Sequence, residues 1–269
     1  MRRIGAIIVG IAALAAIVGP ALVPYDPTAQ ALALRLQAPS AVHPFGLDEL
    51  GRDILSRIVL GARVSFFVGI SVVSVSAVVG TLVGSIAGYF RGRVDDVISR
   101  VMDVLLAFPG ILLAIALVAV LGPSLGHVVL ALSTIGWVAY ARLVRGVALR
   151  TRELDFVQAA RALGAGPTRV LVWHVVPTAL PAVTVQATLG MAGAIIAEAA
   201  LSFLGLGVQP PAPSWGTMLD AGRSHLFDAP HLTIFPGLAI ALLVLGFNFL
   251  GDDLRDRLDP HTAAATMRH

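Results

Sequence analysis

The chain has 269 residues, of which 57% are hydrophobic and 13% charged, and its mean hydropathy is +0.86. A soluble domain carries roughly 25% charged residues, so this composition indicates a protein embedded in a membrane. The absence of cysteine excludes disulfides and thiolate chemistry. The absence of lysine excludes a Gly-x-x-x-x-Gly-Lys phosphate loop, so we do not expect this chain to be an ATPase.

Six apolar runs approach the length needed to cross a hydrocarbon core about 30 Å thick, which takes about 20 helical residues. We therefore predict an all-α membrane protein with six transmembrane helices. The fourth run is the weakest, because polar residues and a glycine dilute it. The runs cover approximately Ile4–Val23, Val64–Phe90, Val101–Leu121, Val128–Val144, Thr178–Leu204 and Thr233–Leu250.

The first run follows Arg2 and Arg3, an arrangement that secretory signal peptides share. It continues to Val23 without a clear small-x-small cleavage site before Tyr25. Its length is also close to that of a full crossing. We therefore favour an uncleaved first helix over a cleaved signal peptide.

The arginines are distributed unevenly between the segments on the two sides of the predicted membrane. If the amino terminus is inside, the inside segments hold Arg2, Arg3, Arg91, Arg93, Arg100, Arg142, Arg145, Arg150, Arg152, Arg161, Arg169, Arg255, Arg257 and Arg268. The outside segments hold only Arg35, Arg52, Arg57, Arg63 and Arg223. This asymmetry predicts that both termini are cytoplasmic. The arginines are not gathered into one stripe with aromatic residues, so we expect no nucleic-acid partner.

Two polar segments are predicted to lie outside. In the first, the apolar spacing from Glu49 to Ile58 predicts a helix at the outer surface. The second contains the run Pro210–Gly216, which resists regular structure and is expected to be a stiff loop. The expected organisation is a first helix with its outside segment (1–62), a transmembrane domain (63–252) with a cytoplasmic loop at 150–177, and a cytoplasmic tail (253–269).

Segment 155–167 carries its own helix start and stop signals. Asp155 is predicted to cap a helix, with Gln158 three residues later completing a capping box. Gly164 suits the left-handed exit position, and Pro167 prevents continuation. The helix has one apolar stripe, formed by Phe156, Ala159, Ala160 and Leu163. We predict that this two-turn helix enters a groove on another protein.

Several residues within the apolar runs have a structural interpretation. One face of the second run carries a glycine every four residues, at Gly80, Gly84 and Gly88, which allows a neighbouring helix to approach closely. Glu198 lies near the outer end of its run, where we expect a structural or helix-pairing role. Asp103 follows Arg100 by three residues, which predicts a salt bridge at the inner rim.

Enzyme signatures are missing from the sequence. His127 and His174 have no partner at metal-ligand spacing, so we expect no metal site. There is no Gly-x-Ser-x-Gly elbow and no His-Glu-x-x-His motif. The apolar runs also offer no paired nucleophile and base for an intramembrane enzyme. We expect a protein that is not an enzyme and holds no cofactor.

Four segments together resemble the permease subunits of bacterial ABC importers, in the dipeptide, oligopeptide and nickel branch and its second, C-type subunit. In the loop, Ala159, Ala160, Gly164 and Pro177 match the family's Glu-Ala-Ala, Gly and Pro pattern, with Gln158 in place of Glu. The other three landmarks are the runs His43–Arg57, Ala199–Gly216 and Gly251–Pro260. They occur in the right order and cover most of the chain.

The resemblance implies a type I importer permease in the bacterial inner membrane, with ATP and Mg²⁺ used by partner subunits. It implies three kinds of partner: a second permease subunit, two ATP-binding subunits or one fused ATPase, and an extracytoplasmic solute-binding protein. The residues expected to contact the ATPase are Phe156, Val157, Gln158, Ala159, Ala160, Arg161, Leu163 and Gly164. Those expected at the outside gate, or in contact with the binding protein, are Phe45, Asp48, Arg52, Asp53, Arg57, Pro211 and Trp215.

Two questions stay open at this point. A stand-alone channel or ion-coupled carrier is the main alternative, because Pro109, Pro181 and Pro236 interrupt or border crossings, as in the broken helices of such carriers. Among ABC substrates, peptides are expected, with nickel and haem as alternatives. The solute cavity is expected to be lined mostly by the second to sixth helices. No side chain in them indicates the charge or the size of the solute.

Overall fold

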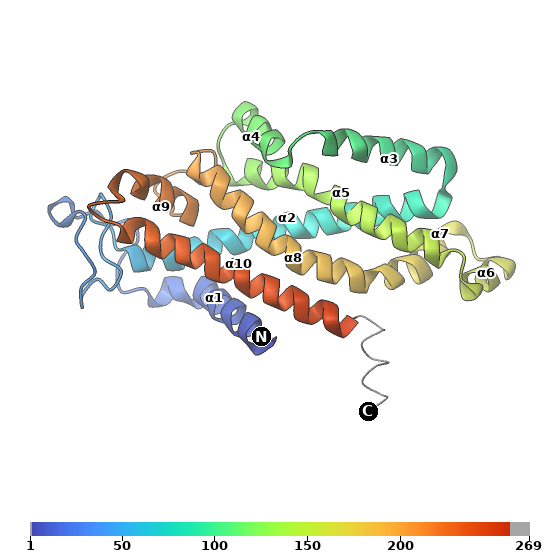
Figure 1. Ribbon diagram of the computed structural model, residues 1–269, viewed down its shortest axis with the longest axis horizontal. Coiled ribbons are helices and arrows are strands. Elements are labelled where there is room, and N and C mark those ends of the chain that lie inside the picture. The colour runs from blue at the N-terminus through green and yellow to red at the C-terminus, as the bar shows by residue number, and fades with distance from the viewer. Residues whose placement is uncertain (1, 259–269) are drawn as a thin grey trace.

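The computed structural model describes residues 2–258, and its regular elements are helices (Figure 1). Within that range, five helices are long and apolar enough to cross a membrane, and one bent pair makes a sixth crossing if it is counted as one. The five belong to α1 (Arg2–Leu22), α2 (Ile54–Phe90), α5 (Leu125–Thr151), α8 (Val176–Phe203) and α10 (His231–Leu258). The all-helical prediction is confirmed. The predicted tail after Leu258, with Asp259, Pro260 and Arg268, lies outside the described residues.

Helix α2 is longer than the predicted second crossing. Its 37 residues begin after Asp53, whose carboxylate accepts a hydrogen bond from the Ser56 backbone N–H at 2.8 Å. This is a side-chain cap, and no breaker follows it before Val64. The predicted separate helix from Glu49 at the outer surface is therefore wrong, because residues from Ile54 onward are the first turns of α2 itself.

The predicted third crossing, Val101–Leu121, is broken. Helices α3 (Gly92–Ala107) and α4 (Gly110–Leu121) meet at an angle of 83°. Pro109 at the junction lacks an N–H group and pushes the preceding residue out of the helical region. Phe108 is accordingly extended, with φ −94° and ψ 136°. A continuous third helix was thus a wrong prediction, although the pair together can make one crossing.

Glycines bring α2 and α5 into close contact, as their spacing predicted. A Cβ atom built on Gly80 would lie 2.5 Å from the Trp137 carbonyl oxygen, and one on Gly88 would lie 2.6 Å from that of Arg145. A Cβ on Gly84 would overlap the backbone of Ala141. Only glycine permits this approach, so the helices run backbone to backbone along this face.

Short elements lie at the two ends of the bundle (Figure 1). One end carries α6 (Asp155–Ala162), α7 (Pro167–Val170) and a π-helical turn (Leu171–Val175) that leads into α8. The other end carries the segment between α1 and α2, with its 3₁₀ turn at Leu32–Leu34, and α9 (Trp215–Gly222), with a further 3₁₀ turn at Arg223–His225. Helix α1 runs toward the α9 end, and α10 runs away from it.

Two groups of buried apolar side chains form the core. One joins α1, α2, α8 and α10, with Ile195 and Leu243 among its fully buried members. The other joins α2, α4, α5 and α8, with Val118 and Leu201 among its fully buried members. Helices α2 and α8 contribute to both groups, so they form the centre on which the functional surfaces are built.

Candidate functional site

Helix α6 is the predicted two-turn helix, but it begins differently from the prediction. Leu154 is its N-cap residue, and no side chain caps it. The Leu154 carbonyl accepts hydrogen bonds from the backbone N–H groups of Val157 and Gln158, at 2.9 and 3.1 Å. The predicted capping box of Asp155 and Gln158 is therefore wrong. Asp155 is the first helical residue, where its carboxylate still faces the positive end of the helix dipole.

The predicted stop signal of α6 is confirmed. Gly164 has a φ of +87°, the left-handed conformation that glycine adopts without strain. Its N–H donates to the Arg161 carbonyl, and the Ala165 N–H donates to the Ala160 carbonyl, each at 3.0 Å. This pair of bonds is a Schellman cap. Pro167 then opens α7, so the chain turns back toward the membrane spans directly after α6.

A small buried cluster holds α6 from beneath. Val157 is fully buried and packs in a group with Tyr89, Ala148, Val170 and Val175, from α2, α5, α7 and the π-helical turn. Val157 is thus the exception among the predicted contact residues, because it faces the protein. One buried valine orients the helix and leaves the opposite side free.

Tyr89 is the residue of this corner that sequence reasoning missed. The Arg161 guanidinium carbon lies 5.8 Å from the centre of the Tyr89 ring, and that of Arg152 lies 5.9 Å from it. Arg152 also donates to the Tyr89 carbonyl. Arg91 pairs with Glu153 at 3.0 Å and ties the end of α2 to the loop before α6. The sequence did offer one signal for the role of Tyr89: it is an aromatic residue close to an arginine at the end of a membrane span.

The outer side of α6 presents the predicted apolar stripe. Leu163 is 89% exposed and Phe156 is 50% exposed. Ala159 and Gln158 are also exposed, and Ala160 is half-buried. The Phe156 ring lies 5.8 Å from the ring of His174, which limits its freedom. A fixed apolar surface of about two turns therefore stands out from this end of the molecule.

At the opposite end, the predicted gate residues form an internal network. Asp48 accepts hydrogen bonds from the backbone N–H groups of Leu50 and Arg52, both at 2.9 Å, and from Arg52 Nε at 2.6 Å. Arg57 Nε lies 3.5 Å from the same carboxylate, and Arg57 Nη1 donates to the Pro27 carbonyl. Asp48, Arg52 and Arg57 are all buried. Their charges hold the segment between α1 and α2 against the start of α2.

The remaining gate residues extend this packing toward α9 and α10. Buried Asp53 accepts from Ser56 and lies 3.0 Å from His43 Nδ1. Buried Trp215 donates to the Ile58 carbonyl at 3.0 Å, and the Phe45 ring stacks on Phe235 at 4.1 Å. Of the predicted gate set, Pro211 alone is exposed and Phe45 is half-buried. Contact with a binding protein stays a prediction.

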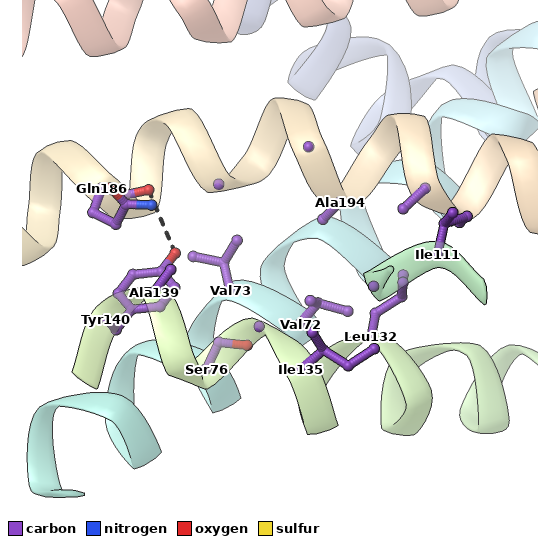
Figure 2. Close-up of a pocket in the computed structure, with 15 residues that line it drawn as sticks. Val72, Val73, Ser76, Ile111, Leu132, Ile135, Ala139, Tyr140, Gln186 and Ala194 are labelled. Atoms are coloured by element: carbon purple, nitrogen blue, oxygen red, sulfur yellow. Dashed lines mark hydrogen bonds between the residues drawn. The ribbon is translucent and has the colours of Figure 1, made fainter. Parts of the chain in front are cut away.

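A cavity of about 290 Å³ lies at mid-length of α2 (Figure 2). Four elements line it: α2, α4, α5 and α8. No carboxylate, arginine or histidine is present in the lining. The lining residues are Val72, Val73, Ser76, Gly110, Ile111, Leu132, Ile135, Gly136, Ala139, Tyr140, Gln186, Gly190, Gly193, Ala194 and Ala197.

Three neutral polar side chains reach this cavity. They belong to Ser76, Tyr140 and Gln186, and the Tyr140 hydroxyl donates to the backbone carbonyl of Gln186 at 3.4 Å, across the gap between α5 and α8 (Figure 2). The buried Ser76 hydroxyl has no hydrogen-bond partner among the described residues. Glycines keep the walls open, because a Cβ on Gly190 would lie 2.5 Å from the Tyr140 hydroxyl. The cavity can therefore offer hydrogen bonds and apolar contact, without a formal charge.

Two ion pairs join α3 to α5. Arg142 Nη2 lies 2.5 Å from Asp103, and Arg145 Nε lies 2.5 Å from Asp95. The predicted partner of Asp103 was Arg100, and that pairing is wrong. Packing of α3 on α5 brings Asp103 to a residue 39 positions later in the chain, which no local spacing could reveal.

Glu198 is fully buried where α8 meets α9. Its carboxylate accepts a hydrogen bond from the Ser202 hydroxyl at 2.7 Å. A Cβ on Gly216 would lie 2.7 Å from the Ser202 Cβ, so the start of α9 rests directly on this turn of α8. Glu198 is therefore part of the packing between these helices. Within residues 2–258, no three His, Asp or Glu side chains gather in a way that could hold a metal ion.

Comparison with known proteins gives two family matches. Residues 80–264 match the binding-protein-dependent transport system inner membrane component, and residues 1–39 match the N-terminal transmembrane domain of oligopeptide transport permease C. A solved structure of the MetNI methionine ABC transporter, in inward-facing conformations, has a TM-score of 0.63 and 18% identity. The match covers 77% of this chain and 98% of that one. This likeness shows the type I permease fold.

Individual relatives agree with the family matches. The dipeptide transport system permease protein DppC of Alkalihalophilus pseudofirmus is 50% identical, covering 84% of this chain and 74% of the relative. The glutathione permease protein GsiD of Pectobacterium atrosepticum is 49% identical, with 83% and 74% covered. The probable D,D-dipeptide permease protein DdpC of Escherichia coli is 42% identical, with 95% and 86% covered. The chain belongs to the binding-protein-dependent transport system inner membrane component family, as the C-type permease subunit of an ABC transporter.

Proposed function

We propose that this chain is the C-type permease subunit of an ATP-driven importer of short peptides. It pairs with a second, homologous permease, and each supplies half of the solute pathway. The names of the relatives support the peptide class, because they include dipeptide, glutathione and D,D-dipeptide permeases. The cavity at mid-length of α2 is this chain's contribution to the pathway.

The observation that carries the proposal is the construction of α6. A helix that buries Val157 and leaves Phe156 and Leu163 exposed is suited to enter a groove on a partner. Burial of the Phe156 and Leu163 side chains in that groove contributes about 1.5–3 kcal/mol each. The partner is a cytoplasmic ATPase, present as two subunits or as one fused chain. ATP and Mg²⁺ bind there, and this chain holds no cofactor.

Both termini lie in the cytoplasm in this proposal. The arginine distribution supports that orientation, since the α6 end carries Arg91, Arg152 and Arg161. The segment between α1 and α2, together with α9, then faces an extracytoplasmic solute-binding protein. Exposed Pro211 and half-buried Phe45 are the gate residues accessible to it.

The test is copurification of the ATPase with tagged permease, with Phe156→Asp and Leu163→Asp as the disruptive variants. Each substitution puts a charge into the docking surface, so both should abolish ATPase binding while membrane insertion persists. Asp155→Ala is the matched control, because it changes an exposed residue of the same helix outside the apolar stripe. Full retention of the ATPase by both disruptive variants contradicts the proposal. ATP hydrolysis by the reconstituted complex, screened over short peptides, nickel chelates and haem, then tests the substrate class.

A further inference from the structure

An open face of α5 runs from the cavity to the α6 end of the molecule. Its residues follow one another at helical spacing: Ile135, Ala139, Arg142, Gly146 and Arg150. Ala139, Arg142 and Arg150 are exposed, and the other two are half-buried. Helix α3 packs on a different side of α5, through Val138 and Ala141. The face of α5 that lines the cavity is therefore continuous with an uncovered strip that extends along α5 toward the α6 end.

One ion pair stands on the edge of this strip. Arg142 follows Ala139, a cavity residue, by three positions, and it pairs with Asp103 of α3. The Arg142 side chain is 50% exposed and that of Asp103 is 66% exposed. Arg142 lies nine residues before Thr151, so it is about 13 Å from the α6 end of the helix. Arg142 therefore lies within a candidate membrane span, Asp103 lies in the first half of the bent pair of α3 and α4, and both side chains are accessible.

Charged side chains within membrane-crossing helices are disfavoured against lipid, and they mark water-filled routes for solutes or ions. The neighbouring pair on the same two helices differs. Arg145 and Asp95 have side chains 34% and 12% exposed, and they are held between α3 and α5. Asp95 accepts two hydrogen bonds from Arg145, so its charge is used in packing. The Arg142–Asp103 pair is the accessible one of the two.

We propose that Arg142 and Asp103 bind the charged ends of the transported solute on its way from the cavity to the cytoplasm. The inference rests on the proposed peptide import, because an unmodified peptide carries both an ammonium and a carboxylate. The guanidinium of Arg142 can hold a carboxylate with two parallel hydrogen bonds, and Asp103 can accept from an ammonium. The cavity has no charged group in its lining. Along the strip from the cavity toward α6, this pair is therefore the first site that can bind the charged groups of the solute.

The experiment uses the complete complex in proteoliposomes, with the solute-binding protein loaded with trialanine and in excess. Trialanine uptake and ATP hydrolysis are measured together, which gives the number of peptides imported per ATP. Arg142→Gln and Asp103→Asn should each lower this ratio about tenfold, since each removes a hydrogen bond to a charged group. Arg142→Lys, which keeps the charge but cannot make two parallel hydrogen bonds, should restore the ratio only in part. Loss of ATP hydrolysis and uptake in equal proportion would show a merely structural role and overturn the inference.

Arg145→Gln is the matched control, because it removes an arginine from the same helix but not from the strip. It should leave the ratio of peptide to ATP unchanged, even if it lowers both rates. A wild-type ratio in Arg142→Gln and Asp103→Asn, in a complex that imports trialanine, overturns this inference and leaves the proposed function intact. If the wild-type complex imports nickel chelates or haem and no peptide, the proposed function fails, and the inference with it.

Discussion

At the α6 end of the molecule, Phe156 and Leu163 stand exposed on a helix held from beneath by a single valine. At the α9 end, Asp48, Arg52 and Arg57 turn inward, and the two arginines share the carboxylate of Asp48. Both ends carry the segments by which the family was identified. One end leaves its characteristic residues exposed, while the other uses them to hold its own backbone in place.

The contrast arises because the chemistry of the residues decides how each segment is used. Apolar side chains on a short capped helix contribute little to the fold, because they remain in contact with water until a partner covers them. Buried charges are unfavourable unless they are paired and hydrogen-bonded, so they impose one backbone arrangement on the segment that contains them. Substitution of the exposed apolar residues at the α6 end should therefore weaken coupling to the ATPase and leave stability unchanged. Substitution of the buried charged residues at the α9 end should lower stability.

The largest expected effect is at the α9 end, for Asp48→Asn. The change leaves Arg52 and Arg57 buried without their carboxylate, which should destabilise the fold by about 3–5 kcal/mol. Thermal unfolding of the detergent-solubilised protein measures the loss. Asp220→Asn is the control, because its pair with Arg223 is mostly exposed and should matter by less than about 1 kcal/mol. Equal stability of the two variants would show that the buried network at the α9 end does not hold the fold.

A smaller loss of stability is expected for Val157→Ala at the α6 end. Removing two methyl groups from a fully buried side chain should cost about 2 kcal/mol, confined to the corner that holds α6. Hydrogen exchange of the amides in residues 155–170 should become faster, while exchange in the middle of α2 stays unchanged. Unchanged exchange in residues 155–170 would show that Val157 does not anchor the helix.

Leu163→Ala should leave the stability of the isolated permease unchanged, because the side chain is 89% exposed. It should weaken ATPase binding by about 1.5–3 kcal/mol, or about 10- to 100-fold in dissociation constant. Titration of the purified ATPase against permease in nanodiscs measures this. A loss of stability without a loss of affinity would place Leu163 with the anchor and not with the docking surface.

The smallest effect is expected for Gln158→Glu, which restores the residue that the family pattern most often has. Gln158 is exposed and makes no cap with Asp155, so stability should change by less than about 0.5 kcal/mol. Any increase in ATPase affinity should be only a few-fold and should disappear at high salt, since an exposed ion pair is screened. An increase that persists at high salt would indicate a buried contact.

Local signals predicted much of the fold. The run at 128–144 falls within α5, and the run at 178–204 matches α8 to within two residues at either end. The glycine spacing in α2 predicted the close approach of a neighbouring helix, which is α5. The break before α4 was also visible, because Pro109 follows Phe108, yet the high apolar content of residues 101–121 favoured one helix. Hydropathy measures length and burial, and it does not detect a change of direction within an apolar run.

The functional surfaces were less predictable. The apolar stripe of α6 followed from helical spacing, which depends on sequence alone. The burial of Val157 and the role of Tyr89 depend on α2, α5 and α7 meeting at one corner, and no local pattern contains that meeting. Arg142 and Asp103 were assigned to the inner side of the membrane, but their pairing and their position below the cavity come from the packing of α3.

Helix α2 begins at Asp53, inside the network that organises the outer segment, and ends at Phe90, beside the tyrosine that underlies α6. Its 37 residues make a rod of about 55 Å with no proline to bend it. A tilt imposed on one tip of such a rod appears at the other without any relay of side-chain rearrangements. If the ATPase docks on α6 as proposed, a movement that it imposes there would reach the α9 end through α2 alone.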